Sequence, residues 1–327
     1  MLEYWEFKLE ADLKPSVVFM GTPDFAVLSL DAIVKAGYEV AAVVTVPDRK
    51  VGRGQKVAFS PVKNYALEHN LPLLQPEKLR DEDFIGQLRG IGADLFVVVA
   101  FRMLPQVVWS MPKMGTFNLH ASLLPQYRGA APINWAIING EKETGVTTFL
   151  LNERIDEGGL LMQRSTPISE NETAETLHDR LAEMGAEMVV ETIKGLEEGS
   201  LKARPQVECD NLKPAPKIFK EDCVIDWSRG GDDIERFVRG LSPYPSAMTV
   251  MSDEGGGVHS FKIYEVSYEK AVGYVEGAVE SDGKTCLKVG CKDGCISILS
   301  LQIEGKRRNS IEEFLRGSRV NSWKIVK

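Results

Sequence analysis

An asparagine and a histidine stand two residues apart in the first half of the chain, at Asn118 and His120. At the end of a β-strand, this spacing places both side chains on one face of the strand. The amide of Asn118 can donate hydrogen bonds without carrying a charge, and the imidazole of His120 can take or give a proton near neutral pH. The turn that follows contains prolines, a glycine and Arg128. We therefore predict that residues 116–132 form a wall of an active site.

An aspartate further along the chain is a candidate partner for this pair. Asp156 follows the β-rich segment 144–150 and comes just before Gly158 and Gly159. Catalytic groups in α/β proteins gather past the ends of strands, although an aspartate in a turn more commonly caps that turn. Because the Asn-x-His pair lies upstream, we predict Asp156 as the third member of the site.

Short apolar strands alternate with helices in the first part of the chain, which is typical of a Rossmann-like, doubly wound, mostly parallel α/β sheet. The predicted strands are 17–20, 40–46, 71–74, 94–100 and 144–150, together with the strand that carries Asn118. The turn after the first strand has the single glycine Gly21 and lacks a G-x-G-x-x-G fingerprint. A nicotinamide-dependent oxidoreductase is therefore disfavoured.

The length of 327 residues favours two domains, since a single core usually stops growing below this size. Beyond a stretch rich in proline and polar residues, short strands are separated by turns, which predicts a small antiparallel barrel of the OB-like kind. A helix is predicted at 231–241, and the barrel strands are predicted at 246–251, 258–268, 274–280, 284–290 and 295–303. The expected organisation is an extension at 1–15, a catalytic domain at 16–204, a linker at 205–217 and a barrel domain at 218–327.

The composition is that of a folded protein outside the membrane, with 43% hydrophobic and 26% charged residues. No apolar run approaches the roughly 20 residues that span a bilayer, and the N-terminus does not resemble a secretory signal. The five cysteines do not form a disulfide pattern, which favours a reducing cytoplasm. Because Cys286, Cys291 and Cys295 lack a Cys-x-x-Cys pair, we expect no metal site.

Basic residues are concentrated in two short stretches. The first lies at 47–56 and contains Arg49, Lys50, Arg53 and Lys56, and the second contains Lys306, Arg307 and Arg308. Charged loops are usually solvated surface. Two glycines around an arginine, as at Arg53, also suit a loop that closes on a phosphate backbone. The residues alone leave both interpretations of the first stretch open.

These motifs together resemble the 10-formyltetrahydrofolate-dependent formyltransferases. The resemblance rests on Phe-Met-Gly-Thr-Pro-Asp-Phe at 19–25, on Asn-x-His at 118–120, on Ser-Leu-Leu-Pro-x-x-Arg-Gly-Ala-Ala-Pro at 122–132, and on Asp156. It extends from about residue 16 to the C-terminus. The basic loop, the segments 216–218 and 225–227 and the barrel pattern make the chain similar to the members of the family that formylate methionyl-tRNA.

The resemblance implies transfer of a formyl group from 10-formyltetrahydrofolate to the α-amine of initiator methionyl-tRNA. It implies that Asn118, His120 and Asp156 are the catalytic trio and that Ser122, Leu123, Leu124 and Pro125 line the folate site. It also implies tRNA contacts through the loop at 47–56 and through the barrel; the contacts expected are Arg49, Lys50, Arg53, Lys56, Lys306, Arg307 and Arg308. We expect a monomer.

Other functions remain as alternatives. A formyltransferase for a sugar-nucleotide amine would use the same trio, whereas an enzyme for glycinamide ribonucleotide is disfavoured by the basic loop and the second domain. A non-catalytic RNA-binding protein is disfavoured by the intact trio. The residues do not decide whether His120 or Asp156 accepts the proton, nor how the segment 101–105 affects folate binding.

Overall fold

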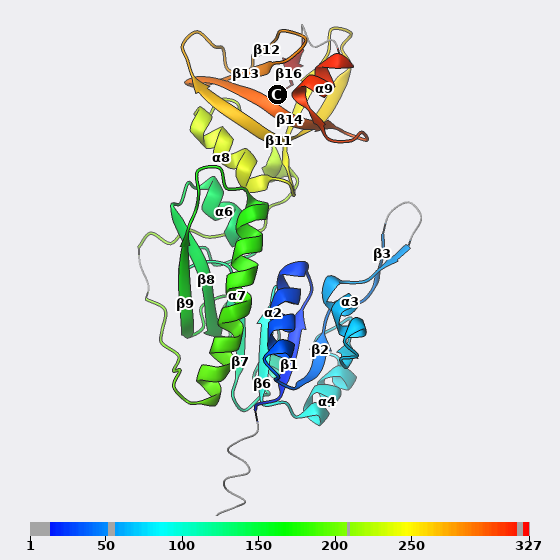
Figure 1. The fold of residues 1–327 in the computed structure, drawn as a ribbon, viewed down its shortest axis with the longest axis vertical. Helices are drawn as coiled ribbons and strands as arrows, with labels where there is room; N and C mark the ends of the chain where they lie inside the picture. The colour runs from blue at the N-terminus through cyan, green and yellow to red at the C-terminus, as the bar shows by residue number, and fades with distance from the viewer. Residues whose placement is uncertain (1–13, 52–55, 208–209, 319–322, 327) are drawn as a thin grey trace, which may run out of the picture. The chain divides into compact units, whose positions relative to one another are not determined.

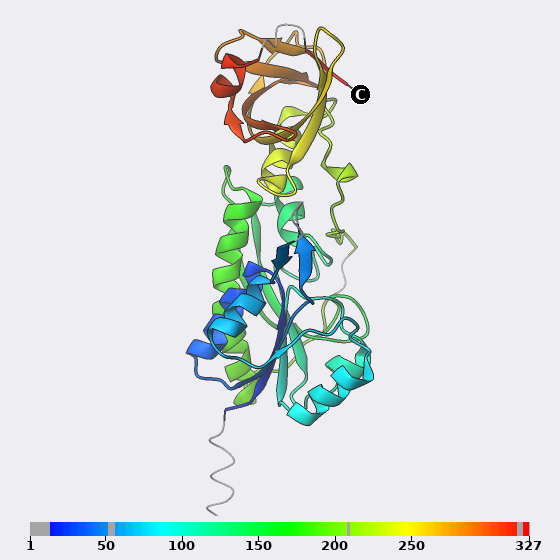
Figure 2. The same ribbon diagram turned by 90° about the vertical axis from the view of Figure 1, so that its right-hand side faces the viewer.

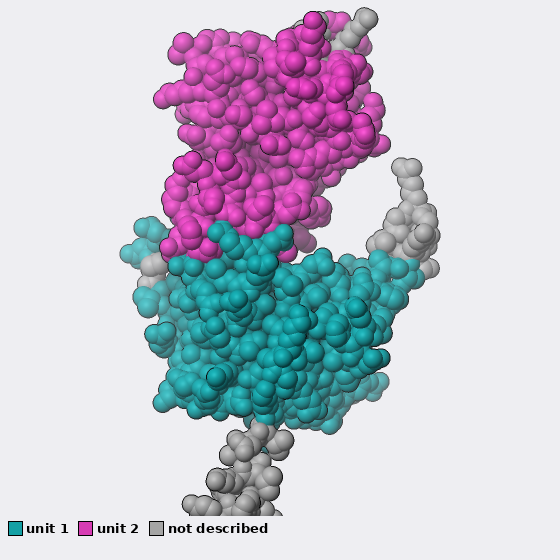
Figure 3. Space-filling view, in the orientation of Figure 1, with its two compact units in different colours: residues 1–128, 145–165, 179–213 teal, residues 129–144, 166–178, 214–327 magenta. Residues whose placement is uncertain are grey.

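The computed structural model describes residues 14–51, 56–207, 210–318 and 323–326. The chain forms two compact units, each assembled from three segments (Figure 3). Unit 1 comprises the residues up to 128 together with 145–165 and 179–213, and unit 2 comprises 129–144, 166–178 and 214–327. The two segments 129–144 and 166–178 therefore lie between segments of unit 1 in the sequence but belong to the unit that contains the C-terminal region.

A seven-stranded sheet forms the centre of unit 1, in the order β5-β2-β1-β6-β7-β8-β9 (Figure 1). Its strands are β1 (Val17–Gly21), β2 (Val40–Val44), β5 (Leu73–Leu74), β6 (Leu95–Val99), β7 (Thr116–His120), β8 (Glu143–Leu150) and β9 (Leu160–Pro167). The strands from β5 to β7 pair in parallel, and β8 is antiparallel to β7. This is the predicted doubly wound sheet, with its change of strand order between β1 and β6; the edge strand β9 was not predicted.

The helices of the first part of the chain are α2 (Asp24–Lys35), α3 (Pro61–Glu68), α4 (Glu82–Ile91), α5 (Gln106–Trp109), α6 (Pro132–Ile138) and α7 (Ala174–Glu197). Helix α7 approaches β7 closely at Gly185, where a Cβ atom would lie 2.6 Å from a methyl carbon of Leu119. Leu119 therefore faces α7. Because side chains alternate along a strand, Asn118 and His120 project from the opposite face of the sheet.

Residues 47–56 were expected as a loop, but the structure places two short antiparallel strands at its ends, β3 (Arg49–Val51) and β4 (Lys56–Ala58) (Figure 1). Asp48 precedes the first of these strands. Its carboxylate accepts hydrogen bonds from Gln75 Nε2 at 2.9 Å and from Lys63 Nζ at 2.6 and 2.8 Å. The bond from Gln75 and the Lys63 ammonium hold the pKa of Asp48 below its ordinary value. Asp48 thereby links the start of the hairpin to α3 and to the segment after β5.

Unit 2 contains an antiparallel, nearly closed barrel, as predicted (Figure 2). Its elements are η1 (Glu221–Cys223), α8 (Gly231–Leu241), β10 (Ala247–Ser252), β11 (Val258–Lys270), β12 (Val279–Ser281), β13 (Leu287–Cys291), β14 (Gly294–Ile303), β15 (Asn309–Ser310), α9 (Ile311–Arg316) and β16 (Lys324–Ile325). Helix α6 packs on α8, where Gly240 leaves room for Ile138. Among the described residues, no helix is long and apolar enough to cross a membrane.

Candidate active site

His120 is the last residue of β7, and its side chain is only 7% exposed. Its Nε2 atom lies 2.8 Å from the carbonyl oxygen of Tyr127. Because a carbonyl can only accept, Nε2 carries the hydrogen and the neutral ring keeps its lone pair on Nδ1. Nδ1 is thus the open nitrogen of His120, the one that could accept a proton.

The open nitrogen of His120 faces the candidate aspartate. Nδ1 lies 3.9 Å from Oδ2 of Asp156, whose side chain is 16% exposed. This distance is beyond a direct hydrogen bond, but the two side chains are close enough to interact electrostatically in a mostly buried setting. The structure therefore brings together the histidine and aspartate that the sequence predicted, 36 positions apart.

Asn118 lies two residues before His120 on the same face of β7, about 7 Å away along the strand. It is paired with Val98 of β6 and Phe149 of β8, so strands on both sides fix its backbone. Its side chain is only partly buried. An amide held on a rigid strand and still partly accessible is suited to donate a hydrogen bond to a developing negative charge.

The turn after β7 is held by side chains from the neighbouring strands. Thr147 of β8 donates from Oγ1 to the carbonyl of Ser122 at 2.6 Å and accepts from the backbone N–H of Leu124 at 3.2 Å. Gln163 of β9 donates to the carbonyl of Leu124 at 2.8 Å. Sequence reasoning missed Thr147 and Gln163, since nothing in their local pattern separates them from ordinary strand residues.

The four predicted folate residues differ in accessibility. Ser122 is fully buried, and its hydroxyl donates to the carbonyl of Gln126 at 2.7 Å. Leu124 is 3% exposed, whereas Leu123 and Pro125 are partly accessible. A ligand at this turn would therefore meet Leu123, Pro125 and main-chain groups, while Ser122 and Leu124 keep the turn in shape.

The turn that carries Asp156 is confined by its surroundings. Asp156 has a φ angle of +55°, in the left-handed region that few residues other than glycine adopt. A Cβ atom at Gly158 would lie 1.6 Å from the carbonyl oxygen of Leu150 in β8, so this position requires glycine. Arg128 also reaches the turn, with Nη1 3.4 Å from Oε1 of Glu157.

The predicted basic contacts belong to different units. Arg49 is exposed at the start of β3 in unit 1, while Arg53 and the side chains of Lys50 and Lys56 lie outside the described residues. In unit 2, Lys306 and Arg307 are exposed. Arg308 lies over the ring of Tyr264 at 4.5 Å and donates from Nε to Ser300 at 2.7 Å. Arg308 is therefore partly engaged within the barrel.

Arg102 lies in the segment 101–105 and is occupied by backbone contacts. Its guanidinium donates to the carbonyls of Pro76 and Glu77 at 2.8 and 3.0 Å. Burial, and then the charge of Arg49, lower the pKa of Arg102. The two arginines therefore place positive charge near the start of β3, and Arg102 also links this segment to the chain after β5.

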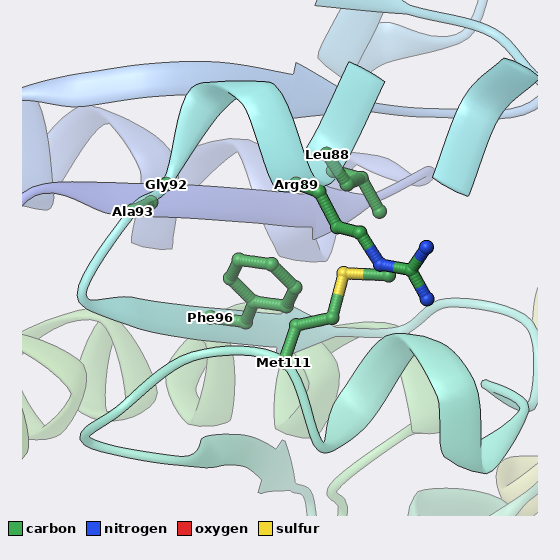
Figure 4. A pocket seen from close by; sticks show the side chains of 6 residues that line it. All are labelled: Leu88, Arg89, Gly92, Ala93, Phe96 and Met111. Atoms are coloured by element: carbon green, nitrogen blue, oxygen red, sulfur yellow. The ribbon is translucent and has the colours of Figure 1, made fainter. Parts of the chain in front are cut away.

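A cavity of about 250 Å³ lies at the other end of the sheet (Figure 4). It is lined by Leu88, Arg89, Gly92, Ala93, Phe96 and Met111. These residues surround the beginning of β6, whereas Asn118 and His120 lie toward the end of β7, so the cavity is separate from the candidate active site. Among the described residues, no group of three or more His, Cys, Asp or Glu side chains is arranged to hold a metal ion.

Comparisons with known proteins give a consistent picture. Family models described as "Formyl transferase" and "Formyl transferase, C-terminal domain" match residues 14–193 and 217–319. Methionyl-tRNA formyltransferase of Bacteroides fragilis is 52% identical over 92% of this chain and 94% of that protein. The enzyme of the same name from Flavobacterium johnsoniae is 50% identical over 93% of this chain and 96% of that protein.

Two solved structures share the fold at low identity. WlaRD, a sugar 3N-formyl transferase solved with dTDP and 5-N-formyl-THF, gives a TM-score of 0.62 at 22% identity, covering 90% of this chain and 99% of that one. HypX from Aquifex aeolicus, in complex with tetrahydrofolic acid, gives a TM-score of 0.61 at 20% identity, covering 96% of this chain and 51% of that one. At these identities the likeness shows the fold alone.

Proposed function

This chain belongs to the formyl transferase family, and on that premise we propose that it formylates methionyl-tRNA with a formyl-tetrahydrofolate as co-substrate. The observation that carries this function is the identity of about half of all positions with methionyl-tRNA formyltransferases over more than 90% of both chains. The likeness includes the barrel as well as the catalytic region. Initiator methionyl-tRNA as the acceptor and 10-formyltetrahydrofolate as the donor are the finer parts of the proposal.

Asn118, His120 and Asp156 are proposed as the groups that assist the chemistry. The neutral α-amine attacks the formyl carbon, a C–N bond forms, and the carbonyl oxygen becomes an oxyanion. The Asn118 amide donates to that oxyanion, an interaction typically worth about 3 kcal/mol in the transition state. The intermediate then collapses as the bond from the formyl carbon to the folate nitrogen breaks.

His120 is the proposed proton acceptor. Its Nε2–H is bound to the Tyr127 carbonyl, so only Nδ1 can take the proton that the attacking amine loses. The Asp156 carboxylate, 3.9 Å from Nδ1, offsets the charge of the resulting imidazolium. His120 can return the proton to the departing folate nitrogen, which leaves the histidine neutral at the end of the cycle.

One assay tests the function against its nearest alternative. The protein is incubated with 10-formyltetrahydrofolate and, in separate reactions, with methionyl-initiator-tRNA, methionyl-elongator-tRNA and a dTDP-linked amino sugar. We expect formylmethionine to form on the initiator tRNA with the highest kcat/KM. Faster formylation of the amino sugar would replace the tRNA function with the sugar-nucleotide one, and comparable rates on both tRNAs would remove the initiator preference.

The tRNA contacts are proposed at the hairpin and on the barrel. They are Arg49, Lys50, Arg53 and Lys56 at the hairpin and Lys306, Arg307 and Arg308 on the barrel. Salt weakens the binding of a protein to phosphates, and each phosphate contact adds about one unit to the slope of the logarithm of affinity against the logarithm of salt concentration. Replacing Arg307 with Ala should therefore raise KM for the tRNA and flatten its salt dependence while leaving KM for the folate unchanged. An unchanged slope would show that Arg307 does not contact a phosphate of the tRNA.

The remaining parts of the proposal concern organisation. A catalytic domain at 16–204 and a barrel domain at 218–327, joined by a linker at 205–217, would act together as a cytoplasmic monomer. Sedimentation equilibrium over a range of concentrations tests the oligomeric state. A mass that rises toward twice that of the chain would contradict the monomer.

A further inference from the structure

The segment after α7 returns to the active site alongside β9. Leu160 and Arg204 exchange two backbone hydrogen bonds, at 2.7 and 2.9 Å, in an antiparallel bridge. Continuing this antiparallel alignment by two residues in each direction brings Gln206 opposite Gly158, in the turn that carries Asp156. Gln206 therefore reaches the candidate catalytic turn although it lies 50 residues beyond it.

Both ends of the Gln206 carboxamide are bonded. Its Nε2 donates to the carbonyls of Asp156 at 2.7 Å and Gly158 at 2.9 Å. Its Oε1 accepts from Arg128, with distances of 3.1 Å to Nε and 2.7 Å to Nη2. Because carbonyls only accept and a guanidinium only donates, this arrangement fixes the orientation of the amide and fits its donors and acceptor without a mismatch.

The turn that carries Asp156 needs stabilising contacts from outside it because its backbone has an uncommon conformation. Asp156 has a positive φ angle, a conformation that persists only when surrounding contacts determine it. On one side, Gly158 is pressed against the carbonyl of Leu150 so closely that no side chain fits. On the other side lies Gln206, which is itself bound by Arg128 from the wall at 116–132. Gln206 thus connects the turn of Asp156 to the wall of His120.

We propose that Gln206 is a positioning residue for catalysis: by bonding both carbonyls around Asp156, it sets the place of the carboxylate beside His120. The inference rests on the proposed function, because it matters only if Asp156 acts on the reaction through His120. A positioning role predicts a loss in turnover, with little change in the binding of either substrate.

Gln206→Met tests the proposal, because methionine keeps the length and bulk of the side chain but removes its hydrogen bonds. We expect kcat to fall roughly 10- to 100-fold, the scale of a small misplacement of a catalytic group, with both KM values within about threefold. Asn134→Leu is the matched control, because Asn134 also donates its amide to a backbone carbonyl, that of Gly240 at 2.7 Å. The control should keep kcat within about twofold. Normal turnover in Gln206→Met, or an equal loss in both variants, would overturn the inference.

A double-mutant cycle separates positioning from general damage. In the Asp156→Asn background, adding Gln206→Met should produce little further loss in single-turnover rate, since residues that act as one unit are strongly non-additive. If Gln206→Met lowers the rate by the same factor in the Asp156→Asn background as in the wild type, the role of Gln206 is overturned and the proposed function still stands. Near-normal activity of Asp156→Asn alone overturns the catalytic assignment of Asp156 itself.

If the Gln206→Met variant does not fold, the proposal is tested with Gln206→Glu. The carboxylate keeps an acceptor for Arg128, but it replaces the donors to the carbonyls of Asp156 and Gly158 with a charged oxygen that those carbonyls repel. We expect the same pattern of lowered kcat and retained KM in this variant. Turnover at the wild-type level would show that the two bonds to the turn are dispensable and would overturn the proposal.

Discussion

Among the described residues, each unit contains a histidine–aspartate pair, and the tighter of these two pairs lies in the barrel, away from the candidate active site. In the barrel, His259 Nε2 lies 2.9 Å from Asp253 Oδ2, and the ring of His259 stacks on Trp323 with centroids 5.2 Å apart. In unit 1, His120 and Asp156 are separated by 3.9 Å. Distance alone would therefore select the barrel pair.

The surroundings reverse that choice. The barrel pair is 37% and 32% exposed, whereas the side chains of His120 and Asp156 are 7% and 16% exposed. Asp253 also accepts from the backbone N–H of Gly257, which makes it the closing residue of its own loop. His120, by contrast, ends a central strand and has one nitrogen fixed by a carbonyl. The deeper burial of His120 and its place on a central strand favour it over His259 as the proposed base.

The largest expected effect comes from removing the histidines. His120→Ala should lower kcat by roughly 10²- to 10⁴-fold, the usual contribution of a general base. His259→Ala should leave turnover within about twofold, and steady-state formylation of methionyl-tRNA measures both. Similar losses in the two variants would contradict the distinction between the pairs.

Replacing Asn118 should have the next largest effect. Asn118→Leu removes the proposed oxyanion donor from β7 and should lower kcat by roughly 10²- to 10³-fold with little change in KM. Asn309→Leu in the barrel is the control, since Asn309 donates its amide only to Glu313 among the described contacts. If the Asn118 variant instead raises KM for the folate at constant kcat, Asn118 is a binding residue.

Gly158→Ala should damage the turn of Asp156 by packing alone. The added methyl group overlaps the carbonyl of Leu150, and relieving this overlap should lower the free energy of unfolding by roughly 1–3 kcal/mol. Gly86→Ala on α4 is the control, because no atom beyond the adjacent residues and the backbone of its own helix lies within 4 Å of the added Cβ, and alanine favours a helix. Urea titration measures the free energy of unfolding of both variants. Equal stability of the two would contradict the steric clash predicted at Gly158.

The smallest effect concerns the barrel pair and depends on pH. The hydrogen bond from His259, followed by the backbone N–H of Gly257, lowers the pKa of Asp253. A carboxyl whose pKa is lowered by folding stabilises the folded protein at a pH above its pKa in the unfolded chain, which is about 4 for an aspartate. This stabilisation is lost as the pH falls through the pKa of the carboxyl in the folded protein. Asp253→Asn should therefore lower the melting temperature at pH 7, and its difference from wild type should shrink below about pH 4. A difference that is constant with pH would contradict this origin.

Local sequence patterns predicted most of the framework. The buried strands β1 and β6 are continuous apolar runs, and helix α8 has the predicted bounds 231–241, because its apolar residues recur at helical spacing. The barrel strands β10, β11, β13 and β14 lie within a few residues of their predicted ranges, whereas the strand predicted at 274–280 is limited to β12 (Val279–Ser281). Strand β9 and the hairpin strands β3 and β4 were missed, since their polar residues at the edge of a sheet follow no clear alternation.

The sequence by itself determined that Asn118 and His120 share a face, because a strand alternates its side chains regardless of what surrounds it. It also determined the family, because the motifs recur in order along the chain. Only the tertiary structure decided that Asp156 approaches His120, that Ser122 is buried, and that Gln206 bonds the turn of Asp156. These contacts join residues up to 50 positions apart. Such contacts between distant residues form only when the chain folds, and the local periodicity of helices and strands does not predict them.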